Sequence, residues 1–163
     1  MDIIITSDTH LPSGQSKLPK RLLEACETAD LIIHAGDWNS VEVYEKLSQF
    51  TQVKGVIGNT DDDSIRALFP EQERMKLAGF NIGIVHGHGE KQTTEKRVLA
   101  AFVDEHTDVI IYGHSHIPLI RYVHKTLLIN PGSPTYKRKL PYYSFAKLKV
   151  TDSVQAELIF FES

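Results

Sequence analysis

The sequence has little of what marks secreted or membrane proteins. It contains one cysteine, Cys26, in 163 residues, so no internal disulfide can form and a reducing compartment is the economical prediction. No apolar run approaches the roughly 18–20 residues of a membrane span, and Asp2 argues against a signal peptide at the start. We therefore expect a cytoplasmic protein with no membrane partner.

The chain also lacks an excess of positive charge. Its 18 Lys and Arg residues against 21 Asp and Glu residues give a formal net charge of −3, so there is no strong signal for nucleic-acid binding. Hydrophobic residues make up 41% and charged residues 24%, which is ordinary globular composition. Because this length fits one compact core, we predict a single domain over residues 1–163.

Apolar runs alternate with helical patterns in the first part of the chain. Strands are expected at 2–6, 31–35 and 52–57, with a helix over 20–28 and another through 50 that Ser40 would cap. This alternation is typical of a parallel sheet. The later patterns favour a hairpin of strands 73–77 and 80–85, followed by a helix over 94–105. Five more strands are expected at 109–112, 119–123, 127–129, 143–150 and 154–161. The expected architecture is α/β, with two packed sheets flanked by helices.

What the sequence does have is histidine, eight residues in all, and several follow the predicted strands. Five strand ends carry Asp, Asn or His, most of them beside glycine: Asp8-Thr9-His10, Gly36-Asp37, Gly58-Asn59, His86-Gly87-His88 and Gly113-His114-Ser115-His116. Ligands of open α/β sheets bind at the carboxyl ends of the strands, and these residue types ligate divalent metals. Each motif alone could be a turn, but the five together predict a metal site.

In this order and spacing the motifs resemble those of the calcineurin-like metallophosphoesterase superfamily. The short chain and the string Asn130-Pro131-Gly132-Ser133 resemble its small bacterial and archaeal phosphodiesterase branch, which shares its fold with the scaffold subunit of retromer. The match runs from Asp8 to about Ser133. The resemblance implies a four-layer α/β/β/α sandwich, in agreement with the pattern of strands and helices, and it allows a homodimer.

The resemblance also implies a site for two divalent metal ions. It assigns Asp8, His10 and His116 to the first ion and Asn59, His86 and His114 to the second, with Asp37 bridging the two. Manganese is the first choice, with iron, zinc, cobalt or nickel as alternatives. Such a pair of ions holds an attacking hydroxide and clamps phosphoryl oxygens during in-line displacement. The implied activity is hydrolysis of a small phosphodiester, with Asp37 and Asn59 among the catalytic groups and Asn59 also binding the substrate.

One position departs from the family pattern. Many superfamily phosphatases have Gly-Asn-His-Glu at the third motif, whereas this chain has Thr60 in place of the histidine. That histidine helps to bind phosphate and to protonate the leaving group, and general-acid help is commonly worth about 10²–10⁴-fold. We therefore expect a preference for diesters with good leaving groups. His88 is the nearest candidate by sequence to replace it as a catalytic and substrate-binding group, and an ordinary loop histidine is the alternative.

Three further interpretations can be compared with the structure. Asp61 to Asp63 precede a short predicted helix and are expected to offset its dipole. The Asn130 to Ser133 segment is expected to be a structural turn between strands, with contact to the site as the alternative. The second functional hypothesis is a non-catalytic protein-binding scaffold on the same fold. Seven ligand-type residues at one edge favour the enzyme, because a scaffold has no need of them.

Overall fold

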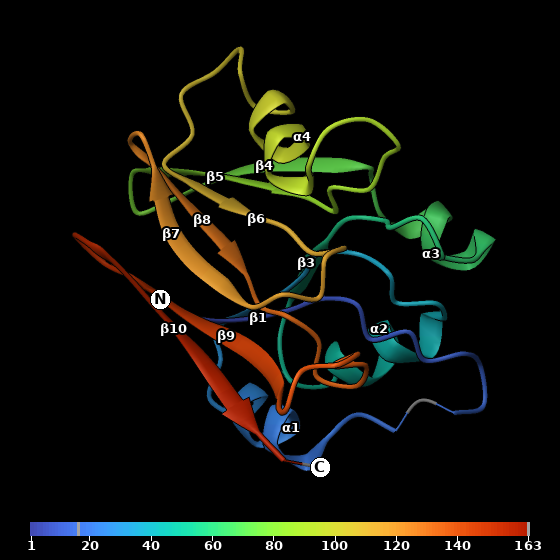
Figure 1. Ribbon diagram of the computed structural model, residues 1–163. Helices are drawn as coiled ribbons and strands as arrows, with labels where there is room; N and C mark the ends of the chain where they lie inside the picture. The colour runs from blue at the N-terminus through green and yellow to red at the C-terminus, as the bar shows by residue number, and fades with distance from the viewer. Residues whose placement is uncertain (16, 163) are drawn as a thin grey trace.

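The computed structural model describes residues 1–15 and 17–162, and it consists of two five-stranded sheets with helices outside them (Figure 1). The first sheet has the order β10-β9-β1-β2-β3. Its strands are β1 (Asp2–Thr6), β2 (Leu31–His34), β3 (Val53–Gly55), β9 (Tyr143–Val150) and β10 (Val154–Phe161). The sheet is mixed, because β1 pairs in parallel with β2 and antiparallel with β9.

The second sheet has the order β4-β5-β6-β8-β7. It contains β4 (Gln72–Leu77), β5 (Phe80–Val85), β6 (Val109–Ile111), β7 (Leu119–Val123) and β8 (Thr126–Asn130). The three central strands β5, β6 and β8 run parallel, and the edge strands β4 and β7 are antiparallel to their neighbours. The predicted hairpin is therefore confirmed.

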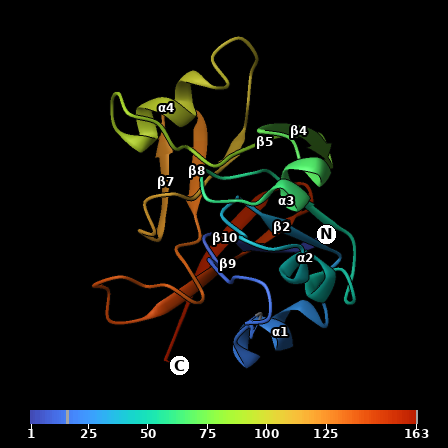
Figure 2. The ribbon, with the colours of Figure 1, turned by 90° about the vertical axis from the view of Figure 1, so that its right-hand side faces the viewer.

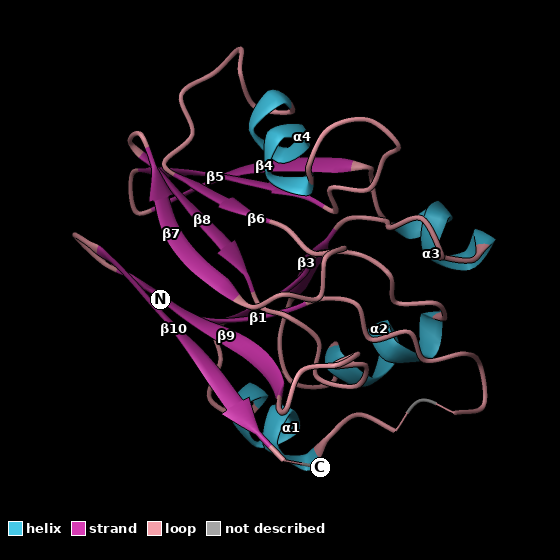
Figure 3. Ribbon diagram, viewed as in Figure 1, coloured by secondary structure: helices cyan, strands magenta, loops and turns pink. Residues whose placement is uncertain are grey.

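The helices form the two outer layers. α1 (Lys20–Cys26), α2 (Val41–Leu47) and α3 (Asp63–Leu68) pack against the outer face of the first sheet, and α4 (Thr94–Ala100) packs against the second. The view turned by 90° likewise separates α4 from α1 and α2 (Figure 2). With the strands inside and the helices outside (Figure 3), the predicted four-layer α/β/β/α sandwich is confirmed.

Alternation within the strands explains this layering. In β1 the buried side chains of Ile3 and Ile5 belong to the core between the sheets, whereas Ile4 belongs to the core beneath the helices. β6 does the same on the other side, with Ile110 turned toward α4. Because successive strand residues point to opposite faces, an uninterrupted apolar run can serve two cores. Burying each such side chain stabilises the fold by about 1.5–3 kcal/mol.

The helices end earlier than the sequence predicts, and one cap differs. After α1, α2 and α4 the chain tightens into i→i+3 bonds, such as Phe50 N–H to the Leu47 carbonyl at 3.1 Å, a common way to satisfy a last turn. Ser40 is the N-cap residue of α2, as predicted, but its side chain makes no cap hydrogen bond, since its hydroxyl donates to the Leu11 carbonyl at 3.0 Å. Among the described residues, 1–15 and 17–162, no helix is long and apolar enough to span a membrane.

Candidate metal centre

The carboxyl ends of parallel strands from both sheets meet in one place. Asp8 follows β1, and its backbone N–H donates to the carbonyl of Gly36, which follows β2, at 2.9 Å. In the second sheet, the N–H of Gly113 after β6 donates to the carbonyl of His86 after β5 at 3.1 Å. The two sheets are joined where the His114 N–H donates to Asp8 Oδ2 at 3.0 Å. The edge at which the sequence predicts ligands is therefore a single locus.

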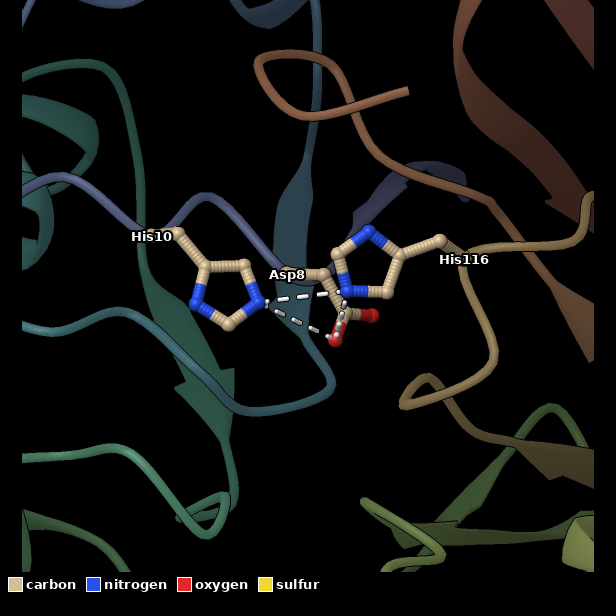
Figure 4. Close-up of side chains that lie close together, drawn as sticks. All are labelled: Asp8, His10 and His116. Atoms are coloured by element: carbon tan, nitrogen blue, oxygen red, sulfur yellow. Dashed lines mark hydrogen bonds and ion pairs between the residues drawn. The ribbon is translucent and has the colours of Figure 1, made fainter. Parts of the chain in front are cut away.

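One group of three side chains combines the first motif with the fifth. Asp8, His10 and His116 point their ligand atoms at one another (Figure 4). The Nε2 atoms of His10 and His116 lie 3.2 Å apart, and they lie 3.8 and 3.3 Å from Asp8 Oδ1. These are the three residues that the resemblance assigns to the first ion.

A second group consists of Asp8, Asp37 and His86. His86 Nε2 lies 3.3 Å from Asp37 Oδ2 and 3.9 Å from Asp8 Oδ1. The same Asp37 oxygen lies 3.5 Å from His10 Nε2, so it stands between the imidazoles of the two groups, where a bridging carboxylate would be. Asp8 also belongs to both groups, which the sequence did not predict.

The tautomers of two histidines fit a cation between these groups. His86 Nδ1 donates to the Ala35 carbonyl at 2.7 Å, and His116 Nδ1 donates to the Tyr136 carbonyl at 2.8 Å. A carbonyl can only accept, so in each neutral ring Nε2 carries the free lone pair. His86 Nε2 is buried and makes no hydrogen bond within the described residues. Imidazole nitrogens and carboxylate oxygens that converge in this way suit manganese, iron, zinc, cobalt or nickel.

The electrostatics of the site favour positive charge at its centre. Burial raises the pKa of Asp8, but His116, His86 and the Ser7 hydroxyl outweigh it and lower the pKa overall. The pKa of Asp37 is lowered in the same way against burial, by His86 and Thr60. Burial would lower the pKa of His86, yet the two carboxylates raise it. Two buried carboxylates thus remain ionised and attract a cation to His86 Nε2.

Backbone strain is concentrated in the predicted ligands. Positive φ angles between 46° and 65° occur at five of the seven, namely Asp8, His10, Asp37, His114 and His116. Asp and His tolerate this left-handed region better than most residues, but each still costs on the order of 1–3 kcal/mol. Such strain persists only where the surroundings enforce it, and it is typical of functional sites.

Two glycines allow the ligand loops to approach one another. A Cβ on Gly113 would lie 1.9 Å from Ser7 Oγ and 2.5 Å from Asp8 Oδ2, and a Cβ on Gly58 would lie 2.1 Å from Asp37 Oδ1. Neither glycine has a positive φ angle, so the requirement is for space. The glycines beside the predicted ligands therefore let the two loops pack directly on the carboxylates.

The Asn130 to Ser133 segment is more than a turn between strands. The Asn130 amide donates to the Gly113 carbonyl at 2.9 Å and to Ser115 Oγ at 3.0 Å. Ser133 Oγ donates to the Asp8 carbonyl at 2.7 Å. The segment therefore makes hydrogen bonds to both the Asp8 motif and the Gly113 motif. This confirms the alternative interpretation, that the segment contacts the site.

The interpretation of Asp61 as a residue that offsets a helix dipole is wrong. Asp62 caps α3 by accepting the Ile65 N–H, whereas the buried Asp61 faces the loops after β2 and β3. Its Oδ2 accepts the N–H groups of Gly58 at 2.7 Å and Asp37 at 3.1 Å, and its Oδ1 accepts that of Asn39 at 2.8 Å. The only sequence signal for these contacts is that Asp61 follows the Gly58 turn.

Three predicted site residues lie outside both groups. The half-buried His114 has its ring 5.3 Å from that of His86, measured between centroids, and burial followed by the charge of His86 lowers its pKa. His88 is exposed, with its ring 5.6 Å from His86 and 6.4 Å from His114. Asn59 is exposed on the adjoining loop. All three border the centre, and their assigned roles stay predictions.

Comparison with known proteins finds relatives that match nearly the whole chain. Residues 1–153 match the model of the calcineurin-like phosphoesterase superfamily domain. A probable metallophosphoesterase of Methanocaldococcus jannaschii is 36% identical over 160 residues, which are 98% of this chain and 81% of the relative. Two solved structures have the same fold. Vps29 from Entamoeba histolytica, complexed with Zn²⁺, has 24% identity and a TM-score of 0.76, over 99% of this chain and all of that one. An archaeal phosphodiesterase has 22% identity and a TM-score of 0.74, with the same coverage.

Proposed function

Because the chain belongs to the calcineurin-like phosphoesterase superfamily, we propose that it is a metal-dependent phosphodiesterase with a dinuclear centre. The observation that carries the proposal is the place of Asp37 Oδ2, between His10 Nε2 at 3.5 Å and His86 Nε2 at 3.3 Å. A carboxylate shared by two imidazole groups is what a bridge between two ions requires. Manganese is the ion we propose first.

Each residue of the centre has a role in this proposal. Asp8, His10 and His116 would hold one ion, His86, Asn59 and His114 would hold the other, and Asp37 would be shared by the two. Bound divalent ions would lower the pKa of a water molecule and offset the charge of the phosphoryl oxygens. The Ala35 and Tyr136 carbonyls keep the rings of His86 and His116 in the tautomer that presents Nε2 to the centre.

Thr60 determines which substrates are favoured. Its hydroxyl donates to Asn39 Oδ1 at 2.7 Å and lies 3.4 Å from His10 Nδ1. An aliphatic hydroxyl is too weak an acid to replace the family's leaving-group histidine near neutral pH. His88 is the candidate that we propose for binding the substrate and protonating the leaving group, since its ring lies beside those of His86 and His114.

The first experiment is hydrolysis of bis-p-nitrophenyl phosphate by metal-stripped protein, before and after addition of manganese. We expect activity to appear with manganese and to disappear with a chelator. If the protein binds two ions but hydrolyses nothing with manganese, nickel, cobalt or zinc, the phosphodiesterase proposal is wrong. The protein-binding scaffold on the same fold would then be the better hypothesis.

A second comparison tests the consequence of Thr60. We expect kcat/KM for bis-p-nitrophenyl phosphate to exceed that for p-nitrophenyl phosphate. The two substrates share a leaving group, but the monoester dianion carries one more negative charge, and the histidine that would help to bind its phosphate is replaced by Thr60. The comparison uses one metal-loaded preparation, so that metal content is the same in both assays. A strong preference for the monoester would contradict the role assigned to Thr60.

A further inference from the structure

An exposed tyrosine borders the candidate metal centre. The Tyr136 side chain is large and apolar, yet the residue is 55% exposed. Its ring centroid lies 5.7 Å from that of His10 and 5.4 Å from that of His116, with the planes inclined at 76° and 78°. The two imidazoles are stacked on each other at 18°, so the tyrosine ring stands across both of them at the rim of the site.

The backbone that carries this ring is held firmly. The Tyr136 N–H donates to Ser133 Oγ at 2.8 Å, and the Tyr136 carbonyl accepts from His116 Nδ1. One residue earlier, Thr135 Oγ1 donates to the Thr9 carbonyl at 2.5 Å. The phenol hydroxyl, in contrast, makes no hydrogen bond within residues 1–15 and 17–162. A ring that is fixed at its base and open to solvent is already arranged to bind a ligand, which lowers the entropy cost of binding.

The charge next to Tyr136 suits an anionic ligand. Lys137, Arg138 and Lys139 follow it directly, although the chain as a whole is acidic. Lys137 already donates to the Pro141 carbonyl at 2.7 Å. Arg138 is exposed and makes no hydrogen bond or ion pair with the rest of the described chain. The aromatic surface beside the metal centre therefore has a free guanidinium two residues further along the chain.

We propose that Tyr136 is a positioning residue that stacks on an aromatic substituent of the phosphodiester while the phosphate lies at the metal centre. The inference rests on the proposed function and narrows its substrate class to diesters that carry a flat aromatic group, such as a nucleobase or an aryl ring. Stacking on an exposed aromatic side chain tolerates different rings, because each presents a π face. It therefore selects the class of substituent and not its exact identity.

The test compares two phosphate ligands that differ only in the base. Binding of adenosine 5′-monophosphate and of ribose 5-phosphate is measured by calorimetry on the full chain loaded with manganese. We expect the parent to bind the nucleotide about tenfold more tightly, a cautious value for one stacked base. Tyr136→Leu should lose this preference without changing the affinity for ribose 5-phosphate, and Tyr136→Phe should keep it because the ring remains.

Tyr122 provides the matched control, since it is 66% exposed and lies on the edge strand β7. Tyr122→Leu should keep the nucleotide preference, and the melting temperatures of all variants should agree because both tyrosines are exposed. The proposal is wrong if the parent binds both ligands equally or binds neither. It is also wrong if Tyr136→Leu retains the preference.

The binding measurement keeps this inference separate from the proposed function, because it requires no turnover. A nucleotide preference that depends on Tyr136 in a protein that hydrolyses nothing would support the inference and overturn the phosphodiesterase. Hydrolysis without such a preference would overturn only the inference. In an active preparation, Tyr136→Leu should raise KM for bis-p-nitrophenyl phosphate about tenfold and change kcat little.

Discussion

Asp37 is the residue on which the proposed mechanism depends most, because it contacts both groups of candidate ligands. Its Oδ2 faces the imidazoles of His10 and His86, and its Oδ1 accepts the Thr60 N–H at 2.9 Å. One side chain therefore joins both groups of candidate ligands and fixes the loop after β3. Removing its charge while keeping its shape isolates the first of these roles from the second.

We predict that Asp37→Asn abolishes metal-dependent hydrolysis and leaves the fold intact. The amide keeps the volume and can still accept from Thr60, but it lacks the negative charge that a bridge between two cations needs. Activity on bis-p-nitrophenyl phosphate and metal content after gel filtration are the measurements, with the exposed Asp152→Asn as the control. A variant that binds two ions and turns over at the parent rate would show that the bridging assignment is wrong.

A second residue, His34, makes the stability of the fold beside the site depend on pH. It is fully buried, its Nδ1 accepts the Gly36 N–H at 3.2 Å, and its Nε2 lies 3.1 Å from Thr9 Oγ1. The ring therefore carries its proton on Nε2 and supports the loop that ends at Asp37. Burial lowers the pKa of His34 from 6.5 to about 3, since a second proton would charge a buried ring and break the bond from Gly36.

This shift predicts a loss of stability in acid. The unfolded chain binds a proton near pH 6.5 while the folded chain resists it down to about pH 3, so the free energy of unfolding falls as the pH falls through this window. The contribution of His34 between pH 7 and pH 5 is about 2 kcal/mol.

Urea unfolding of the parent and of His34→Asn at pH 7 and pH 5 measures this contribution. Asparagine keeps an acceptor for Gly36 without a titrating group, so the variant should lose about 2 kcal/mol less than the parent over this range. His124→Asn, a change in an exposed turn, is the control variant and is measured at the same two pH values. Equal losses in the parent and in His34→Asn would contradict the prediction.

At the scale of elements, the site depends on carboxylate and amide groups that tie one loop to another. Asp61 accepts N–H groups from the loops after β2 and β3, and Asn130 ties β8 to the loop after β6. The ligand loops are short. The loops after β1, β2 and β6 each contain at least one predicted ligand with a positive φ angle. Their conformation is therefore enforced by neighbours more than by local preference.

We predict that Asp61→Asn lowers the free energy of unfolding by about 1–3 kcal/mol and weakens metal binding about 10–100-fold. The amide nitrogen would face at least one backbone N–H, so a buried donor would be left without an acceptor. Chemical unfolding and metal titration are the measurements. Asp63→Asn, in the first turn of α3, is the matched control and should cost less than about 1 kcal/mol. Equal effects of the two substitutions would show that Asp61 does not hold the loops after β2 and β3 in place.

The strand ends could be predicted from the sequence, whereas the contacts of Asp61 could not. The strands and the edge that collects polar residues are local patterns, because alternation and apolar runs are written in consecutive residues. The first group, Asp8, His10 and His116, also follows once the family motifs are matched. The partners of Asp61 and the double membership of Asp8 depend on how separate loops pack, and no periodicity in the chain encodes that. The helix ends were missed for the same reason.

For the molecule as a whole, metal binding and stability should be coupled. The candidate ligands come from both sheets, so an ion bound between them is bound by the folded state alone. At a free metal concentration 100 times Kd this linkage adds about 2.7 kcal/mol, which for a chain of this size corresponds to roughly 5–10 °C in melting temperature.

Thermal unfolding with manganese or with a chelator measures this coupling. We expect the melting temperature of the parent to rise by roughly 5–10 °C on metal loading, and that of Asp37→Asn to rise much less. A rise of the same size in both proteins would place the stabilising ion elsewhere in the molecule.

The position of β1 in the middle of its sheet has a consequence for biosynthesis. The order β10-β9-β1-β2-β3 places β1, which precedes the other described strands along the chain, between β2 and β9, and Ile3 pairs with both Leu31 and Leu148. Until residues 143–150 emerge, one side of β1 has no partner in its sheet. Since non-local pairings of this kind are intrinsically slow to form, the strand that presents Asp8 is translated before β9 and is among the last of the described strands to gain all its partners.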